Sequence, residues 1–331
     1  MLRRILIALA VVVCLSAVGA GWLWWHEQPK AQGEAYVGAG DVPLWDGTGQ
    51  VRRRLARLSY GDKVTILDRY RDSVEVRTPA GVVGWADESG LLMPDLWARL
   101  EKLAASTQAM VVQARGHVGV LANLRINPGR DAPRIGQLTR GAPVEVLGRG
   151  VVPSGPPAPA HTIVDTEQRK EDWLLVRARV PGFGAIAGWV LGRFVAYDMP
   201  DPLPQYATSE GFRPVAWFEL HNVTDPAAGP KPYYLVAGTR GPEGQSCDFT
   251  TLHVYTWSLA HHGYETAFVQ NDLCGRLPVA VTLEPGEDAQ FRFENVDSAG
   301  TRTLAYRMRS TIVRPVREGR RAPRRGGRRR R

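Results

Sequence analysis

The chain contains the sequence Arg57-Leu-Ser-Tyr-Gly-Asp-Lys-Val-Thr-Ile-Leu67, and a variant of it, Gln137-Leu-Thr-Arg-Gly-Ala-Pro-Val-Glu-Val-Leu147, begins 80 residues later. In both copies a leucine precedes a glycine-containing turn, and apolar residues then occupy every second position. Alternation with a period of two around a glycine turn is typical of short antiparallel β-strands. The sequence therefore predicts two similar β-sheets in the first two thirds of the chain.

The similarity between the two copies extends beyond this strand pair. The further matched segments are Val42-Pro-Leu-Trp45 with Asn123-Leu-Arg-Ile-Asn127, Ser73-Val-Glu-Val-Arg77 with Trp173-Leu-Leu-Val-Arg177, and Val83-Gly-Trp-Ala86 with Ala187-Gly-Trp-Val190. Glycine-centred turns at this spacing favour small barrels. We expect two degenerate repeats, at residues 35–93 and 110–198.

These segments resemble the bacterial Src-homology-3-like (SH3b) family, whose members show a Leu-Arg strand, a Leu-x-x-Gly-x-x-Val-x-Val-Leu strand pair, a Trp-x-x-Val strand and a closing Gly-Trp-Val. The resemblance implies two tandem small β-barrels. The first copy has Ser73 where the family usually has tryptophan. The second copy carries an insertion at residues 148–170, whose proline-rich part we expect to form a stiff, extended loop rather than a strand.

The charge of the chain is concentrated at its C-terminal end. The formal net charge is +9, and residues 314–331 contain ten arginines and one acid, Glu318, so the remainder sums to zero. A basic face on a folded domain is therefore not indicated, and nucleic acid is an unlikely partner. Residues 317–331 are predicted to be disordered. The candidate contacts of this tail with anionic lipid or polymer are Arg320, Arg321, Arg324, Arg325, Arg328, Arg329, Arg330 and Arg331; a purely solubilising role is the alternative.

Residues 5–25 form an uncharged apolar segment long enough to cross a bilayer as a helix. Arg3 and Arg4 precede it, so the positive-inside rule places residues 1–4 in the cytoplasm and everything after the linker 26–34 in the periplasm or outside the cell. A cleaved signal peptide is the alternative. The tryptophans at the end of the segment favour a retained signal-anchor.

The remainder of the chain divides at proline-rich boundaries. Apolar residues at helical spacing predict a linker helix over 94–109. The prolines of 199–211 predict a linker without a helix or central strand. Residues 212–316 contain several β-like runs and match no family securely. Among these runs, Leu252–Val269 is typical of a hairpin.

Cys247 and Cys274 are the only cysteines outside the membrane segment. In an oxidising compartment they are expected to form a disulfide. The alternative is a catalytic thiol, because SH3-like domains often accompany cell-wall hydrolases, but neither cysteine has the sequence context of those enzymes. No other catalytic motif, metal-ligand spacing or cofactor motif is present.

The remaining candidates are aromatic. Trp45, Tyr60, Trp85, Trp173 and Trp189 could contact a glycan or peptide; packing within the barrels is the alternative. The sequence predicts a mainly β, non-enzymatic, membrane-anchored envelope protein that binds or senses peptidoglycan or an envelope partner. A wall-remodelling hydrolase with catalysis in 212–316, and a scaffold or regulatory subunit, are the alternatives.

Overall fold

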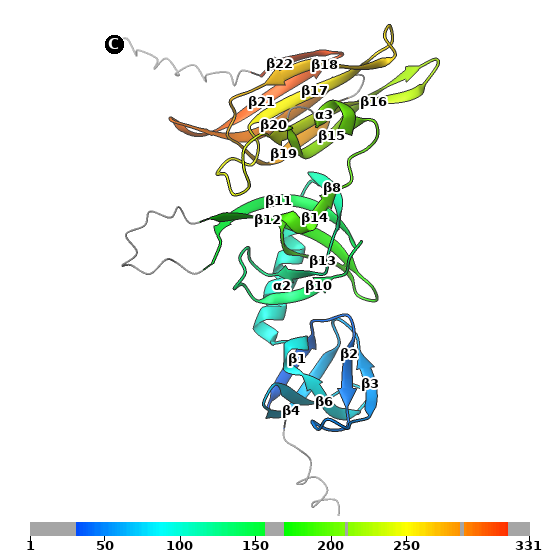
Figure 1. Ribbon diagram of the computed structural model, residues 1–331, viewed down its shortest axis with the longest axis vertical. Coiled ribbons are helices and arrows are strands. Elements are labelled where there is room, and N and C mark those ends of the chain that lie inside the picture. The colour runs from blue at the N-terminus through cyan, green and yellow to red at the C-terminus, as the bar shows by residue number, and fades with distance from the viewer. Residues whose placement is uncertain (1–30, 156–168, 209–210, 285–287, 317–331) are drawn as a thin grey trace, which may run out of the picture. The chain divides into compact units, whose positions relative to one another are not determined.

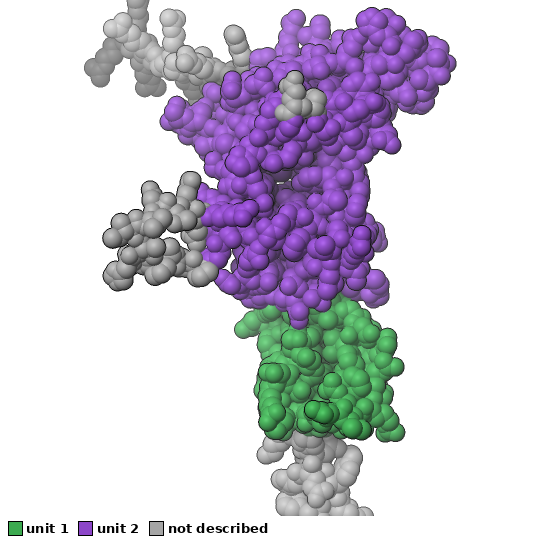
Figure 2. Space-filling model, viewed as in Figure 1, with its two compact units in different colours: residues 1–98 green, residues 99–331 purple. Residues whose placement is uncertain are grey.

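The repeated strand pattern produces two antiparallel sheets with the same connectivity. A computed structural model describes residues 31–155, 169–208, 211–284 and 288–316. They divide between two compact units, 1–98 and 99–331 (Figure 2). The strand order is β3-β2-β6-β5-β4-β1-β7 in the first sheet and β10-β9-β13-β12-β11-β8-β14 in the second. Adding seven to each strand number of the first sheet gives the order of the second, so the two sheets have the same connectivity.

The first unit holds one seven-stranded sheet (Figure 1). Its elements are β1 (Gly33–Val37), β2 (Val42–Trp45), β3 (Arg54–Leu58), β4 (Lys63–Tyr70), β5 (Ser73–Arg77), β6 (Val83–Asp87), the 3-10 turn η1 (Glu88–Gly90) and β7 (Leu91–Leu92). The alternating residues Val64, Ile66, Val74 and Val76 are buried in one core. The period of two in the sequence thus corresponds to the buried face of the sheet.

The second unit begins with the second seven-stranded sheet. Its elements are β8 (Ala114–Val118), β9 (Ala122–Arg125), β10 (Arg134–Leu138), β11 (Pro143–Pro153), β12 (Lys170–Val180), β13 (Gly184–Leu191), η2 (Gly192–Phe194) and β14 (Val195–Tyr197). The proline-rich part of the insertion begins at Val152, and the expectation that it forms a loop is wrong at its start, because β11 runs to Pro153, which pairs with Lys170 on β12. A register shift after Val146 lets both strands continue as a ribbon, and Pro153 stands at its end, where a missing N–H is tolerated. The middle of the insertion lies outside the described residues.

Two helices flank this sheet in the sequence. The predicted linker helix forms as α2 (Pro94–Thr107), and the boundary between the two units falls within it. The prediction that 199–211 contains no helix is wrong, because α3 spans Leu203–Ala207. Pro204 lies in its first turn, where no intrahelical hydrogen bond is required from the residue's nitrogen. Proline therefore starts this short helix rather than preventing it.

The C-terminal part of the chain forms two four-stranded antiparallel sheets, called here the C-terminal sandwich. One sheet contains β15 (Arg213–Asp225), β16 (Gly229–Thr239), β17 (Thr251–Ser258) and β18 (Gly263–Gln270); the other contains β19 (Gly275–Leu283), β20 (Asp288–Asp297), β21 (Gly300–Arg309) and β22 (Ile312–Pro315). Phe249, Leu252, Phe291 and Met308 belong to one apolar core shared by both sheets. The predicted hairpin at Leu252–Val269 is confirmed as β17 and β18.

The chain is thus mainly β with several antiparallel sheets, as the sequence predicts. Within the described ranges, no helix has both the length and the apolar character needed to span a bilayer. The predicted anchor at 5–25 and the arginine-rich tail at 317–331 lie outside the described residues.

Candidate functional site

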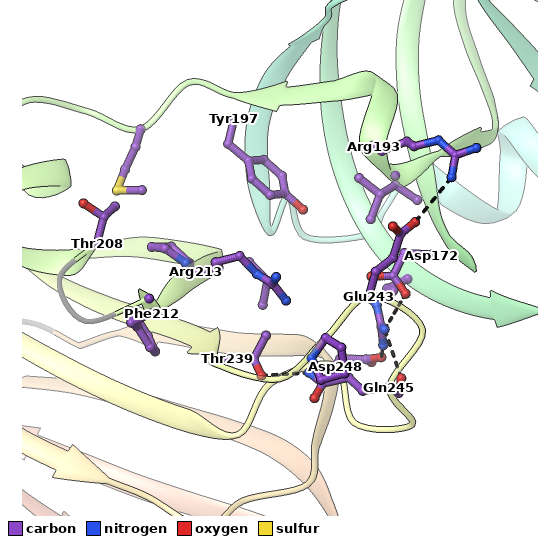
Figure 3. Close-up of a pocket in the computed structure, with 18 residues that line it drawn as sticks. Asp172, Arg193, Tyr197, Thr208, Phe212, Arg213, Thr239, Glu243, Gln245 and Asp248 are labelled. Carbon is purple, nitrogen blue, oxygen red and sulfur yellow. Dashed lines mark hydrogen bonds and ion pairs between the residues drawn. The ribbon is translucent and has the colours of Figure 1, made fainter. Parts of the chain in front are cut away.

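A cavity of about 580 Å³ opens in the second unit where the second sheet meets the C-terminal sandwich (Figure 3). Strands β11, β12 and β14 contribute to one side of it, and β15 with the loop after β16 contributes to the other. The described residues that line it are Arg149, Asp172, Leu174, Gly192, Arg193, Tyr197, Met199, Thr208, Gly211, Phe212, Arg213, Pro214, Val215, Thr239, Pro242, Glu243, Gln245 and Asp248. Most of the lining surface is apolar, although six of the lining residues carry a charged side chain.

Arg149 forms the charged base of the cavity. Its guanidinium is buried and donates to Asp172 Oδ1 at 2.6 Å and to Asp248 Oδ1 at 2.9 Å. It also donates to the carbonyl oxygens of Gln245 at 3.0 Å and Cys247 at 3.2 Å. A buried cation is tolerated only when it is paired and hydrogen-bonded, and Arg149 meets both conditions. This guanidinium is therefore committed to holding the loop after β16 against β11 and β12.

The loop at 240–250 is positioned by further hydrogen bonds to the same groups. The backbone N–H of Gly244 donates to Asp172 Oδ1 at 2.9 Å. Gly244 has a positive φ of 81°, and a Cβ there would lie 2.6 Å from the carbonyl oxygen of Lys170. Only glycine fits this close approach. The Gln245 side chain donates to Thr239 Oγ1 at 2.8 Å, which fixes the other end of the loop.

Two arginines with more exposed side chains, Arg193 and Arg213, also line the cavity. Arg193 lies 3.3 Å from Glu171 and 4.0 Å from Glu243. Glu171 is buried and is already held by Arg130 at 2.6 Å, and this hydrogen bond lowers the pKa of Glu171. Arg213 donates to the carbonyl oxygen of Gly241 and reaches into the middle of the cavity (Figure 3). The four terminal N–H groups of Arg149 are all used within the protein, whereas Arg193 and Arg213 retain terminal N–H donors for a ligand.

Tyr197 supplies a neutral polar group to the apolar wall. Its ring meets that of Trp217 edge to face at 5.8 Å. Burial raises the pKa of Tyr197 to about 12, so its hydroxyl stays protonated at physiological pH. Met199, Phe212 and Val215 complete this wall. The cavity can therefore accept an apolar group beside a carboxylate or phosphate bound by arginine.

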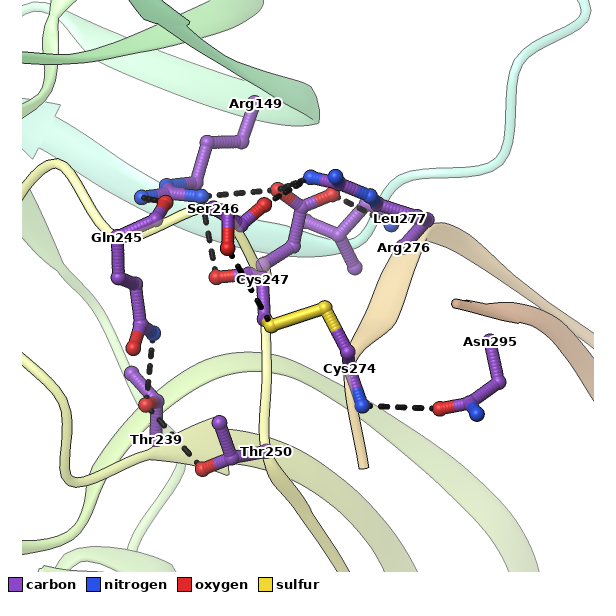
Figure 4. The surroundings of a disulfide bond; sticks show 11 residues. Arg149, Thr239, Gln245, Ser246, Cys247, Thr250, Cys274, Arg276, Leu277 and Asn295 are labelled. Atoms are coloured by element: carbon purple, nitrogen blue, oxygen red, sulfur yellow. Dashed lines mark hydrogen bonds and ion pairs between the residues drawn. A yellow bond between two sulfur atoms is a disulfide. The ribbon is translucent and has the colours of Figure 1, made fainter. Parts of the chain in front are cut away.

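Cys247 and Cys274 form a disulfide next to this cavity, as the sequence predicts (Figure 4). Asp248, which follows Cys247, accepts from Arg149 and from the backbone N–H of Leu277 at 2.8 Å. The backbone N–H of Cys274 donates to Asn295 at 2.9 Å. Both sulfur atoms are bonded to each other, so neither is a free thiol that could act as a nucleophile. The disulfide fastens the cavity loop to the sandwich.

Two of the five aromatic candidates are buried. Tyr60 is 5% exposed and packs near Trp97 at 6.0 Å, and burial raises its pKa. Trp173 is 3% exposed. The burial of both rings favours packing, the alternative to ligand contact, at these two positions.

The other three aromatic candidates are half-buried. Trp45 on β2 and Trp85 on β6 are direct cross-strand partners, and the guanidinium of Arg52 lies 4.3 Å from the Trp45 ring. Trp189 packs on the backbone at Gly150, where an added Cβ would lie 3.0 Å from its ring. Trp45 and Trp85 therefore lie together on the first sheet, whereas the second sheet pairs Trp189 with Arg125.

The cavity residues were not predicted from the sequence. Arg149, Asp172 and Asp248 lie as far as 99 residues apart, and no local motif links them. The one available signal is a charged residue inside an apolar strand pattern, as at Arg149. Histidines His253, His261 and His262 form no metal site, and the described residues contain no cluster of three or more potential ligands.

No protein-family model and no curated protein matches the sequence. Among solved structures, the chain is similar to an NlpC/P60 family protein from Bacillus cereus, with 16% identity over 50% of this chain and 56% of that one and a TM-score of 0.21. NlpC2 and NlpC1 from Trichomonas vaginalis show 11% and 10% identity over 84% of this chain and 93% and 89% of theirs, each with a TM-score of 0.18. The chain thus spans about half the length of the Bacillus protein. At these TM-scores the likenesses carry no argument about activity.

Proposed function

We propose that this chain is a non-enzymatic, membrane-anchored protein of the cell envelope, and that the cavity between the second sheet and the C-terminal sandwich binds peptidoglycan or an envelope partner. The sequence resemblance to the SH3-like family and the shared strand order of the two sheets support the proposal that residues 35–93 and 110–198 are SH3-like barrels. The predicted anchor at 5–25 would keep both beside a bilayer.

The observation that carries the proposal is the composition of the cavity. Its wall is apolar around Phe212 and Met199, and two arginines, Arg193 and Arg213, are among its lining residues. The peptide stems of peptidoglycan carry free carboxylates next to small apolar side chains. Arginine binds carboxylates with strong, charge-assisted hydrogen bonds. A short acidic peptide therefore matches both parts of the cavity.

The proposal of a binding role rather than a hydrolytic one also draws on the disulfide. A hydrolase that used either cysteine would require a thiolate, and the sulfur atoms of Cys247 and Cys274 are bonded to each other. The described residues of the cavity lining include no cysteine, serine or histidine. This lining supplies hydrogen-bond donors and apolar contacts, which are the means of binding.

Co-sedimentation of residues 31–316 with purified cell wall tests the proposal. We expect retention of the parent at low salt and a loss of roughly tenfold in affinity for Arg193→Gln/Arg213→Gln, because two charge-assisted contacts are removed. Arg302→Gln is the matched control, since Arg302 lies on β21 and pairs with Asp297 at 3.0 Å, away from the cavity. Equal retention of all three proteins would show that the cavity is not the site that binds the cell wall. Lysis of the wall by the parent would favour the hydrolase alternative.

A further inference from the structure

The last two strands of the C-terminal sandwich place arginines directly opposite each other. In the register of β21 with β22, Arg307 is the partner of Arg314, and Arg309 is the partner of Ile312. Like charges at directly paired positions of an antiparallel sheet repel each other. A fold that keeps two arginines in this arrangement would gain stability from an anion between them.

The protein itself neutralises these arginines incompletely. Arg309 lies 3.3 Å from Asp288 and Arg307 lies 3.6 Å from Glu284. Within the described parts of the chain, no acidic side chain forms an ion pair with Arg314. The Nε atom of Arg307 is buried and has no hydrogen-bond partner there either. Two carboxylates thus accompany three guanidinium groups, which leaves a positive charge that an oxyanion could neutralise.

Apolar side chains accompany these arginines on the same surface. Ile312 is 57% exposed and Val316 is 42% exposed. Together with Pro315 they line one hollow with the three arginines. Strand β22 is the edge strand of its sheet, at the end of the described chain (Figure 1). This surface, called here the β22 edge, is thus both cationic and apolar.

We propose that the β22 edge binds the anionic headgroups of a lipid bilayer. Phosphate oxygens would lie between Arg307, Arg309 and Arg314, and Ile312 with Val316 would enter the boundary of the acyl region. A soluble polyanion would match the arginines alone and would leave the two apolar side chains in water. This site belongs to the folded sandwich and is separate both from the cavity and from the arginine-rich tail.

Vesicle capture by the full-length chain tests the proposal. The chain is held by its N-terminal segment in phosphatidylcholine nanodiscs and mixed with sedimenting vesicles of phosphatidylcholine with or without phosphatidylglycerol. We expect capture by the phosphatidylglycerol vesicles. Arg307→Gln/Arg314→Gln should weaken it by about 25-fold, since each arginine contributes roughly fivefold near an anionic surface. Arg302→Gln, on the same strand, should leave it unchanged.

The tail is intact in every variant, so its contribution to capture is constant. Unchanged capture of Arg307→Gln/Arg314→Gln would overturn the proposal and assign the binding to the tail. Because the double variant removes a repulsive pair, its urea midpoint should equal or exceed that of the parent, which separates lost binding from misfolding.

A second variant distinguishes lipid from soluble polyanion. Ile312→Ser should weaken capture by the vesicles but not retention on immobilised polyphosphate, because only the bilayer offers an apolar partner. Equal binding of parent and Ile312→Ser to the vesicles would contradict a bilayer as the occupant. Loss of capture at high salt in the parent is expected as well.

Discussion

The buried side chain of Gln113 hydrogen-bonds both backbone groups of Val279, 166 residues later in the chain. Gln113 Oε1 accepts from the N–H of Val279 at 2.7 Å, and Nε2 donates to its carbonyl oxygen at 3.3 Å. The pairing of β19 with β20 is irregular between Arg276 and Ala280, so Val279 has no partner on β20. The side-chain amide of Gln113 thus takes the place of the β20 residue that Val279 lacks as a hydrogen-bond partner, and it joins the second sheet to the sandwich.

Replacing Gln113 should therefore be costly. Gln113→Met keeps the volume but leaves the N–H and C=O of Val279 buried without partners, at about 1 to 3 kcal/mol each. We expect urea unfolding of residues 31–316 to show a loss of about 2 to 6 kcal/mol, the sum of the two costs. Gln137→Met is the control, because Gln137 bonds Asn123 on the surface and should change stability little. Equal effects of both changes would mean that Gln113 does not carry this link.

Replacing Arg149 should also lower the stability of the protein. Arg149→Met removes the cation that Asp172 and Asp248 share and leaves Asp248 only the longer ion pair with Arg276, at 3.7 Å. Breaking a buried pair costs about 3 to 5 kcal/mol. Thermal unfolding should show the loss, and Arg149→Met/Asp248→Asn should recover part of it. Arg302→Met, in an exposed ion pair, should cost less than about 1 kcal/mol. A double variant no more stable than the single one would show that the two residues are not coupled.

The environment of Asp225 should make the stability of the protein depend on pH. Its carboxylate is buried and accepts from His262 at 2.7 Å and from the Trp257 indole at 2.7 Å, and these bonds hold its pKa well below the usual range. Since the pKa is depressed in the folded state, the stabilisation is present above about pH 4 and is lost as the pH falls below that. His262→Asn should therefore destabilise the protein most above about pH 4.

The neighbouring histidine provides the control for this measurement. His261 bonds the exposed Glu265, so His261→Asn should have a much smaller effect at every pH. Asparagine is chosen because His262 has a positive φ of 49°, which asparagine tolerates. A pH-independent difference between His262→Asn and the parent, measured by urea unfolding from pH 7 to pH 3, would contradict the role of Asp225.

The disulfide should be present in the protein isolated without reductant and should stabilise it. The sequence has three cysteines, so the unreduced, denatured full chain should expose one thiol, that of Cys14, and three after reduction. Cys247→Ser/Cys274→Ser should lose about 3 kcal/mol, because the bridge closes a loop of about 26 residues. Three reactive thiols before reduction would show that the bond does not form.

The sequence supplied the β-strands but not the site. Alternation at Val64 and Ile66, and again at Val144 and Val146, predicts strands because a period of two buries one face of a sheet. It could not exclude α3, since Pro204 is compatible with the first turn of a helix. Nor could it separate Trp173, which is buried, from Trp189, because both stand in strands and only the packing of neighbouring elements fixes their exposure.

What the sequence determined by itself was local: the two strand repeats, the hairpin at 252–269 and the pairing of the only two cysteines outside the apolar segment. Each follows from periodicity, turn residues or simple counting. The tertiary structure alone decided the cavity, the Gln113–Val279 link and the opposition of Arg307 to Arg314. The first two join residues far apart in the chain, and the third depends on strand register, which no sequence spacing specifies.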